Sequence, residues 1–374
     1  MALCFIFQPR DLPVVAEPLV PEKAMQETRL TVGFKLSQFA FRIQRSSRTS
    51  IKDYELLSLL GQGGFGKVYL AKHKHSEEKV AIKTIKKGCI DSAYMTDQII
   101  HEKRLLKLAS VKQTPFLVGL FASFQTTHHL CLAIEYCPGG DLADRLLKGS
   151  IKQETTVFYA GCVVLGLQFL HKYNIIHRDI KTSNIVIGRD GYAKITDFGL
   201  AKRPVYGYGM TYTICGTLPY MAPEMLTNKC YTNSVDWWAF GVVLYEMLVR
   251  DMPFVAATKD SLSETIKNKE PCYPKKLTED SRDIFKKLFI KDPKSRLGSQ
   301  RGAEEVMECP FFKELDFEAL SRKEIPAPFI PKEKKTGFLY KIFHRKQVLT
   351  LKNENVPIPS YIEKEFKNFD CDTF

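Results

Sequence analysis

The distribution of apolar residues changes near Gly140, and no other feature of the chain constrains its fold as strongly. Before this point, short segments with the apolar spacing of strands follow one another, and residues 93–110 have the apolar spacing of a helix. After it come long apolar segments, including 157–174 and 234–249, which are typical of buried helices. Strands in one part and helices in the other predict an α+β fold with two lobes.

The chain of 374 residues is long enough for two lobes and further segments. Residues 54–136 are expected to form a small lobe with five strands and one main helix, and residues 137–312 a larger, mainly helical lobe. Residues 1–53 begin with scattered prolines and end in a basic, Ser-rich stretch, so we expect a partly disordered extension. Residues 313–374 form a C-terminal tail.

Composition narrows the class of protein. The net charge of +13 favours anionic partners without choosing among nucleic acid, phosphorylated ligands and anionic lipid. The ten cysteines include no Cys-x-x-Cys pair, which argues against a zinc site and fits a reducing, intracellular compartment. We therefore expect a cytoplasmic protein, with the nucleus and the membrane surface left open. No apolar stretch reaches the roughly 18–20 residues of a transmembrane helix, and no signal peptide is expected.

The first chemical motif is the glycine series Gly61-x-Gly63-x-x-Gly66. A lone series of this kind also fits a plain hairpin or a dinucleotide-binding turn. In a dinucleotide-binding unit the glycines open a helix, whereas Val68 and the residue after it continue into a strand. Glycines in such a loop let backbone N–H groups approach phosphate oxygens closely, so the loop is a candidate phosphate site.

Two charged residues follow this loop. Lys83 lies in the third strand and Glu102 in the next helix. Either residue alone fits an ordinary solvent-facing position. Together they permit another interpretation, in which Lys83 binds phosphate oxygens and Glu102 holds its ammonium group.

The densest group of candidate catalytic and metal-binding residues lies after the predicted helix 157–174. Asp179, Lys181 and Asn184 share one short loop, and Asp197 follows thirteen residues after Asn184. An Asp190-Gly191 turn lies between them and predicts a hairpin that returns Asp197 to the side of Asn184. Taken alone, Asp197 is more typical of a turn. An amide and a carboxylate converging at one point suit magnesium with bound phosphates.

These motifs, in this order, resemble the signature of protein kinases, and the chain is most similar to the AGC group of serine/threonine kinases, which includes protein kinases A, C and N and the ribosomal-protein kinases. Further segments carry the resemblance: "YTICGTLPYMAPE", "KDPKSRLG" and "IPAPFIP". It implies an enzyme of intracellular signalling that transfers the γ-phosphoryl group of Mg-ATP to Ser or Thr hydroxyls of proteins in basic sequence contexts.

The resemblance also implies individual roles. Asp179 would orient the substrate hydroxyl and accept its proton, and Lys181 would lie near the transferred group. Asn184 and Asp197 would bind magnesium. The residues implied in ATP binding are Gly61, Gly63, Gly64, Phe65, Gly66, Val68, Lys83, Glu102, Glu135, Cys137 and Asp141.

Regulatory features are implied in the same way. Thr213 matches the activation-loop phosphosite, whose phosphate, added by an upstream kinase, would meet Arg178 and Lys202. In the tail, Phe366 and Phe369 match two rings that dock beside the helix carrying Glu102. Asp370 stands where many relatives carry a phosphorylatable residue, so its carboxylate would replace a phosphate. Three further matches are Thr217, which would contact Asp179 and favour Ser/Thr substrates, and the pair Glu224–Arg296, which would brace the larger lobe.

The sequence departs from the pattern at several positions. Thr182-Ser183 replaces a pair that often carries an acid reading substrate arginine, although Asp141 and Glu246 retain two such acids. Leu218-Pro219 replaces the usual Pro-Glu of the substrate-binding loop. Gln98 stands where some relatives have a histidine that contacts the phosphate, which predicts looser coupling. Self-modification at Ser46 or Ser50 and a turn-motif phosphosite at Thr350 or Ser360 are left open.

Two other functions compete with this interpretation. A scaffold with a kinase fold would bind partners without transferring phosphate, but such proteins usually lack a catalytic residue, and here Lys83, Asp179, Asn184 and Asp197 are all present. A nucleic-acid binder is suggested by the basic charge alone, and no recognition motif supports it.

Overall fold

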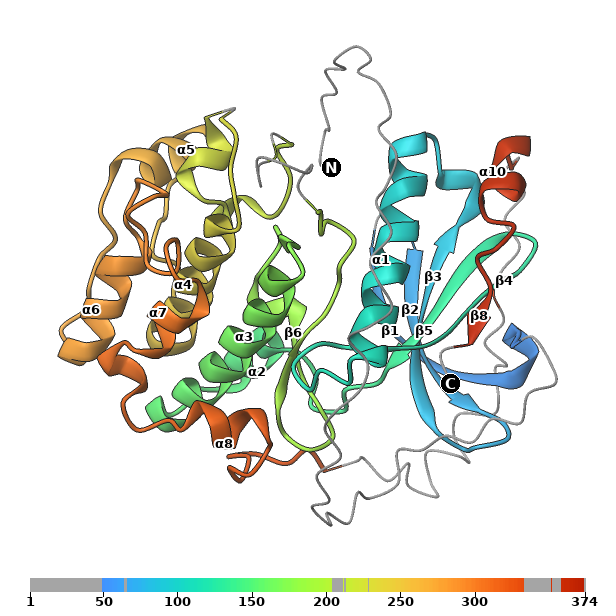
Figure 1. Ribbon diagram of the computed structural model, residues 1–374, viewed down its shortest axis with the longest axis horizontal. Coiled ribbons are helices and arrows are strands. Elements are labelled where there is room, and N and C mark those ends of the chain that lie inside the picture. The colour runs from blue at the N-terminus through green and yellow to red at the C-terminus, as the bar shows by residue number, and fades with distance from the viewer. Residues whose placement is uncertain are drawn as a thin grey trace, which may run out of the picture. The chain divides into compact units, whose positions relative to one another are not determined.

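The computed structural model describes residues 49–63, 66–203, 211, 213–227, 229–332, 351 and 358–372. All of them belong to one unit, residues 47–373. The extension up to residue 48, which includes Ser46, lies outside the described residues, as do Gly64, Phe65 and Thr350. Within them, the predicted α+β fold with a strand-rich and a helical lobe is confirmed (Figure 1).

The strand-rich lobe is an antiparallel sheet with one long helix beside it. The predicted five strands lie side by side in the order β1-β2-β3-β5-β4. Their bounds are β1 Tyr54–Gln62, β2 Gly66–His73, β3 Lys79–Lys86, β4 Leu120–Gln125 and β5 His129–Glu135. The helix α1, Ala93–Val111, begins where the Ser92 side chain accepts a hydrogen bond from the Met95 N–H.

Side chains alternate along these strands, so the sheet has two apolar faces. One face buries a small cluster that includes Tyr54, Ile82 and Phe124. The other packs against α1 through residues such as Leu130 and Leu132, which belong to the main core. The helix therefore lies where its buried Glu102 can reach the sheet residue Lys83.

The C-terminal tail adds a sixth strand to this sheet, beyond the five that were predicted. The short helix α10, Ser360–Glu365, is followed by β8, Cys371–Asp372. This strand pairs antiparallel with β4, with Ser123 opposite Cys371 and Ala122 opposite Asp372. Figure 1 shows α10 and β8, in red, beside β4 at the edge of the sheet.

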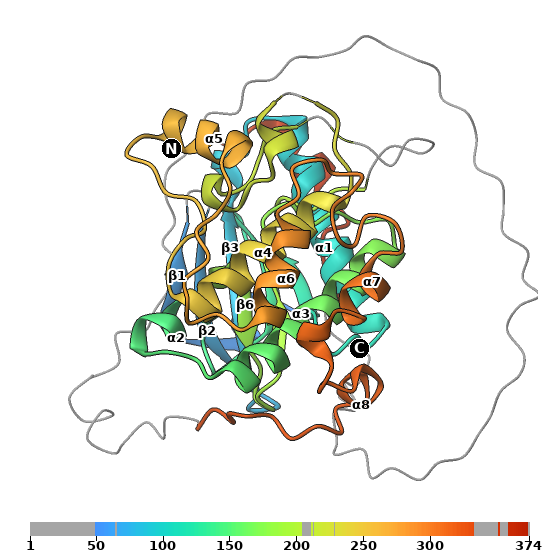
Figure 2. The ribbon, with the colours of Figure 1, turned by 90° about the vertical axis from the view of Figure 1, so that its left-hand side faces the viewer.

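The other lobe is built around two helices that are apolar on nearly all sides. Helix α3, Gln153–Lys172, starts four residues before the predicted segment, and α4, Ser234–Val249, contacts both α3 and α6 (Figure 2). The remaining helices are α2 Leu142–Lys148, α5 Lys259–Asn268, α6 Glu279–Leu288, α7 Ala303–Met307 and α8 Phe317–Ser321. The 3-10 helices are η1 Ile51–Asp53, η2 Lys87–Cys89, η3 Thr182–Asn184, η4 Leu218–Tyr220, η5 Pro223–Leu226 and η6 Pro310–Phe312.

A buried ion pair braces this lobe, as predicted. Two guanidinium nitrogens of Arg296 donate to the two carboxylate oxygens of Glu224 at 2.6 and 2.9 Å. Arg296 also donates to the Ser234 carbonyl at 3.0 Å. Its side chain is completely buried, so these acceptors replace the water that the cation loses. Within the described residues, no helix is both long and apolar enough to cross a membrane.

Candidate active site

The loop that carries Asp179 is held in place by hydrogen bonds to a buried carboxylate. Asp236, in the first turn of α4, is fully buried and accepts hydrogen bonds from the backbone N–H groups of His177 and Arg178, both at 2.9 Å. The same carboxylate also contacts His171 at the end of α3, whose Nε2 lies 2.9 Å away. Arg178 has a positive φ of 67°, a conformation that non-glycine residues rarely adopt. Asp236 thus fixes an unusual backbone turn directly before Asp179.

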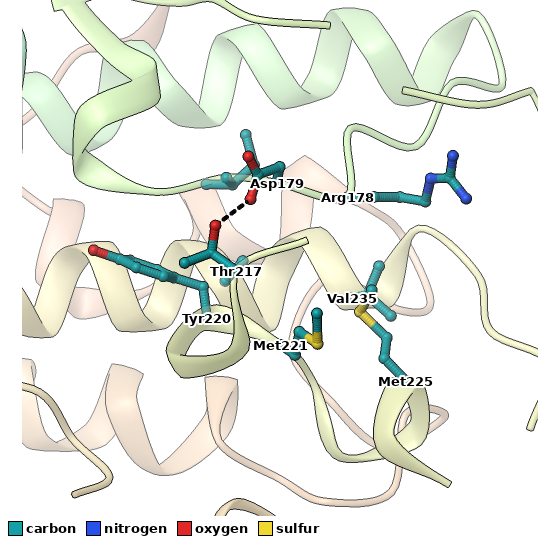
Figure 3. Close-up of a pocket in the computed structure, with 9 residues that line it drawn as sticks. Arg178, Asp179, Thr217, Tyr220, Met221, Met225 and Val235 are labelled. Atoms are coloured by element: carbon teal, nitrogen blue, oxygen red, sulfur yellow. Dashed lines mark hydrogen bonds between the residues drawn. The ribbon is translucent and has the colours of Figure 1, made fainter. Parts of the chain in front are cut away.

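Three side chains converge on the Asp179 carboxylate. The Thr217 hydroxyl donates to Oδ1 at 2.7 Å, and the Lys181 ammonium and the Asn184 amide donate to Oδ2 at 2.7 and 3.1 Å. Lys181 also donates to the Thr217 hydroxyl at 3.0 Å, which closes a triangle. Figure 3 shows the bond between Thr217 and Asp179, with Met221, Met225 and Val235 on the opposite side of Thr217 from Asp179. The carboxylate is therefore held in one orientation by groups from two loops.

A second charged group links the two lobes. The Lys83 ammonium lies 2.6 Å from Glu102 Oε1 and 2.8 Å from Asp197 Oδ1. Burial alone would lower the pKa of Lys83, but the two carboxylates outweigh it and raise the pKa above its ordinary value. The attraction of Lys83 lowers the pKa of Asp197 to about 2, so Asp197 is ionised at any physiological pH.

The predicted hairpin brings Asn184 and Asp197 together. Strands β6, Ile185–Ile187, and β7, Ala193–Ile195, pair with Ile185 opposite Ile195. One step further, the Thr196 N–H donates to the Asn184 carbonyl at 2.9 Å. Asp197 itself has a positive φ of 61°, which aspartate tolerates better than most residues.

These two residues fit a magnesium ion by their chemistry. The Asn184 amide nitrogen is engaged with Asp179, which leaves its amide oxygen as the available ligand atom. Asp197 supplies an ionised carboxylate that is 48% exposed and so open to solvent. One carboxylate, one amide oxygen and access for water and phosphates are what magnesium takes from a protein.

The glycine loop lies beside Lys83 by strand register. Gly61 is opposite Val68 across β1 and β2, and Val68 is opposite Lys83 across β2 and β3. At Gly66 an added Cβ would come within 1.7 Å of the Thr84 carbonyl oxygen, so only glycine fits. Around Gly61 and Gly63 no other described atom lies within 4 Å of such a Cβ, so the described part of the loop is open there.

Three further predicted residues lie where β5 leaves the sheet. The Glu135 carboxylate pairs with Lys194 of β7 at 2.8 Å, and the Asp141 carboxylate accepts from the Asp144 N–H at 2.8 Å to cap α2. Burial raises the pKa of the Cys137 thiol, which is therefore protonated. The side chains of Glu135 and Asp141 therefore both have partners within the chain.

Cations surround the approach to Thr213. The Tyr231 hydroxyl donates to the Thr213 carbonyl at 2.5 Å and accepts from Arg178 at 3.4 Å. Figure 3 shows the Arg178 side chain pointing away from Thr217, consistent with its bonds to Tyr231 and to the Leu200 carbonyl. Burial and the charge of Arg178 together lower the pKa of Lys202. Neither cation forms an ion pair with a carboxylate in the described part of the chain.

His101 also belongs to this cluster, although no motif in the sequence points to it. The Gln98 side chain forms a hydrogen bond within its own helix, where its amide donates to the Tyr94 hydroxyl at 2.9 Å. One turn later His101 Nε2 is buried and has no hydrogen-bond partner among the described residues. Burial and the charges of Arg203, Arg104 and Arg178 lower the pKa of His101. A histidine on α1 thus lies near the cations, but at position 101 and not at position 98.

Glu246, another acid near the site, already accepts hydrogen bonds from neighbouring side chains. Glu246 accepts hydrogen bonds from the Tyr220 hydroxyl at 2.6 Å and from the Thr182 hydroxyl at 3.2 Å. Burial raises the pKa of Glu246. Thr182, one of the residues that departs from the family pattern, therefore contacts an acid expected to read substrate arginine.

The tail rings are buried beside α1. Phe366 and Phe369 are 1% and 2% exposed, and their rings meet edge to face with centroids 5.6 Å apart. The Lys103 ammonium of α1 lies over the Phe369 ring, 4.9 Å from its centroid. Asp370 follows, and its Oδ1 is buried with no hydrogen-bond partner in the part of the chain that the structure describes.

The sequence of this chain is similar to those of known proteins. The family model of the protein kinase domain matches residues 54–312. Serine/threonine-protein kinase N2 of Danio rerio is 42% identical over 291 residues, which are 78% of this chain and 30% of that protein. The delta and eta types of protein kinase C from Mus musculus are each 39% identical, over 329 and 334 residues, which are 87% of this chain and 48% of each relative.

The chain thus spans less than half the length of these relatives. The family model covers most of the chain, and the similar proteins confirm the resemblance inferred from the motifs. The chain belongs to the protein kinase family and, within it, to the AGC group of serine/threonine kinases.

Proposed function

We propose that the chain is an active, ATP-dependent serine/threonine protein kinase rather than a scaffold with a kinase fold. The observation that carries this proposal is the complete and connected set of charged groups, with Asp179 held from three sides and Lys83 held between Glu102 and Asp197. A scaffold would not need the orientation of Asp179 to be fixed.

Each residue then has a definite task. Asp179 Oδ2 accepts the proton of the substrate hydroxyl as that oxygen attacks the γ-phosphorus, while Thr217 keeps the carboxylate oriented. Lys181, 2.7 Å from Asp179, places a positive charge beside the transferred group. Lys83 holds the non-transferred phosphates, and Glu102 holds Lys83. Asn184 and Asp197 would hold a magnesium ion, which would supply positive charge beside the phosphates.

Substrates in basic contexts are favoured by the remaining acids. Asp141 and Glu246 are both half-buried acids on the helical lobe. Glu246 shares its carboxylate with Thr182 and Tyr220, so we expect a moderate rather than strict preference for arginine. Eight cysteines of the described residues have free thiols, which supports a reducing setting, and we place the protein in the cytoplasm.

The test is magnesium-dependent transfer of labelled phosphate from ATP to an arginine-containing peptide with one Ser, repeated with Thr in its place. Asp179→Asn keeps the shape of the side chain and should abolish transfer, and Lys83→Met should raise the KM for ATP. If the parent transfers no more than Asp179→Asn, the chain is a scaffold. Transfer to a tyrosine peptide alone would contradict the Ser/Thr assignment.

The docked tail supports a second proposal, that it regulates this site. The buried rings of Phe366 and Phe369 contact the helix that carries Glu102, so releasing them should loosen the Glu102–Lys83 pair. The double variant Phe366→Ala, Phe369→Ala should lower kcat while the protein still binds peptide. Unchanged turnover would show that the tail does not control the helix.

A further inference from the structure

Lys291, in the segment that follows α6, holds the C-terminal end of helix α5. Its amine donates to the backbone carbonyls of Ile266 and Lys269 at 2.8 and 2.7 Å. Ile266 lies in the last turn of α5, and Lys269 is the C-terminal cap of that helix. The last carbonyls of a helix have no partner within the helix, so a donor from another segment satisfies them, and a positive charge there also interacts favourably with the helix dipole.

The surroundings of this amine are aromatic and cationic. Its nitrogen lies 4.4 Å from the ring centroid of Phe254 and 4.9 Å from that of Trp238. The Arg296 guanidinium lies over the same Trp238 ring, 5.1 Å from its centroid. Lys291 is half-buried and forms no ion pair with a carboxylate among the described residues. Burial lowers the pKa of Lys291 to about 8, the charge of Glu270 opposes this effect, and that of Arg296 adds to it.

The two carbonyls also suit a neutral amine. An ammonium group has three N–H donors and a neutral amine has two, whereas the structure gives this nitrogen two hydrogen-bond acceptors. Lys291 can therefore lose a proton, which leaves a nucleophilic lone pair, and still keep both bonds to α5. Acylation changes this balance, because an amide nitrogen has one N–H and no charge. One of the two carbonyls at the end of α5 then loses its donor.

The ring beside the amine has a donor of its own to satisfy. Trp238 is fully buried, and its indole Nε1 has no hydrogen-bond partner in the described part of the chain. Buried indole N–H groups usually have one. The carbonyl oxygen of an acyl group on Lys291 would bring an acceptor next to this ring, and the apolar part of the group would meet the two aromatic rings.

We propose that Lys291 is an acylation site for acyl thioesters and that its acylation releases the end of α5. The lone pair of the neutral amine attacks the thioester carbonyl carbon and forms the amide C–N bond. The C–S bond breaks, the thiolate leaves, and the amine proton passes to water. Of the ten residues of α5, all of them described, Ile266 alone is fully buried, so the helix has little else to fix its end. Helix α5 contacts η4 and η5, which closely follow Thr217, so the change reaches the loop that orients Asp179.

The first measurement compares the acylation rates of two lysines in the full chain. The protein is mixed with acetyl-coenzyme A at pH 7.4, and acetylation of each lysine is followed by mass spectrometry. Lys286 of α6 is the matched control, because it is exposed and forms no ion pair among the described residues. Lys291 should react about 10-fold faster than Lys286, since its larger neutral fraction outweighs its lower exposure. An equal or slower rate at Lys291 would overturn the proposed site.

The second measurement tests the release of α5 by hydrogen exchange. Lys291→Gln removes the charge as acetylation does, whereas Lys291→Arg keeps a cation with several donors. The amides of residues 262–269 should exchange about 10-fold faster in the acetylated chain and in Lys291→Gln than in the parent, and at nearly the parent rate in Lys291→Arg. The amides of α6 should not change in any of the three.

Unchanged exchange of α5 in the acetylated chain would refute the release, and so would faster exchange of α5 and α6 together, because that indicates general unfolding. Should Lys291→Gln fail to fold, the acetylated parent chain decides the question alone. Neither measurement uses phosphoryl transfer, so a failed kinase assay would leave both results interpretable.

Discussion

The hydroxyl of Thr217 offers a sharp test of how Asp179 is held. Thr217→Val replaces this hydroxyl with a methyl group of nearly the same size. The change removes the 2.7 Å bond to Asp179 Oδ1 and the acceptor for Lys181 at 3.0 Å. Asp179 and Lys181 keep their own contact at 2.7 Å, so the site loses the orientation of one carboxylate oxygen and not its charge.

The size of the effect follows from this geometry. A hydrogen bond to a charged group contributes about 1.5–3 kcal/mol. If that bond acts in the transition state, kcat/KM for the peptide should fall by about 10- to 150-fold. The KM for ATP should not change, because the hydrogen bonds of the Thr217 side chain go to Asp179 and Lys181 and not to the residues assigned to the phosphates.

The assay is steady-state transfer to a serine peptide at saturating magnesium and ATP. Thr217→Ser keeps the hydroxyl and should remain close to the parent, and thermal melting should show that both variants are folded. A Val variant as active as the parent would refute the argument that this bond orients Asp179. A Ser variant as weak as the Val variant would assign the effect to the packing of the methyl group.

Three further predictions concern stability, pH and regulation. Glu224→Gln leaves the fully buried Arg296 without its counter-charge, so urea denaturation should show a loss of about 3 kcal/mol, whereas Asp280→Asn in the exposed pair with Lys313 should cost less than about 1 kcal/mol. Asp197 has a pKa lowered to about 2, so its attraction to Lys83 is present above the ordinary aspartate range and is lost as pH falls from about 4 to 2. Because its side chain is 48% exposed, solvent screens the pair, and Asp197→Asn should remove on the order of 1 kcal/mol of this acid dependence in denaturation curves. Phosphorylation of Thr213 should raise the pKa of His101 by neutralising the surrounding cations, and an NMR titration of the histidine that does not move would place the phosphate elsewhere.

Local chemistry made much of the site predictable from the sequence. The Asp190-Gly191 turn fixes a short hairpin, and a hairpin of that length must return Asp197 to Asn184. The apolar spacing of residues 93–110 places Glu102 on the buried face of α1, within reach of Lys83. In each case the pattern that allows the prediction is local, a turn within one hairpin or the apolar spacing of one helix.

The features that were missed depend on distant parts of the chain. A two-residue strand such as β8 has no periodicity, and its partner β4 is defined only in the folded protein. Lys87 stands in the polar run "KTIKKG" and is typical of a solvent-facing position until Glu363 covers it. His101 was missed because its surroundings are set by Arg178 and Arg203, which reach it from other loops.

The pairing of the tail with β4 also bears on how the chain is made. Ser123 and Phe369 are joined by a hydrogen bond but lie 246 residues apart in the sequence. At about 5–20 residues per second, a ribosome makes the second roughly 12–50 seconds after the first. Through that interval the edge of β4 and the apolar surface under Phe366 have no partner from the tail. A nascent chain therefore exposes a bare strand edge for much of its synthesis, the state most open to chaperones and to association with neighbouring chains.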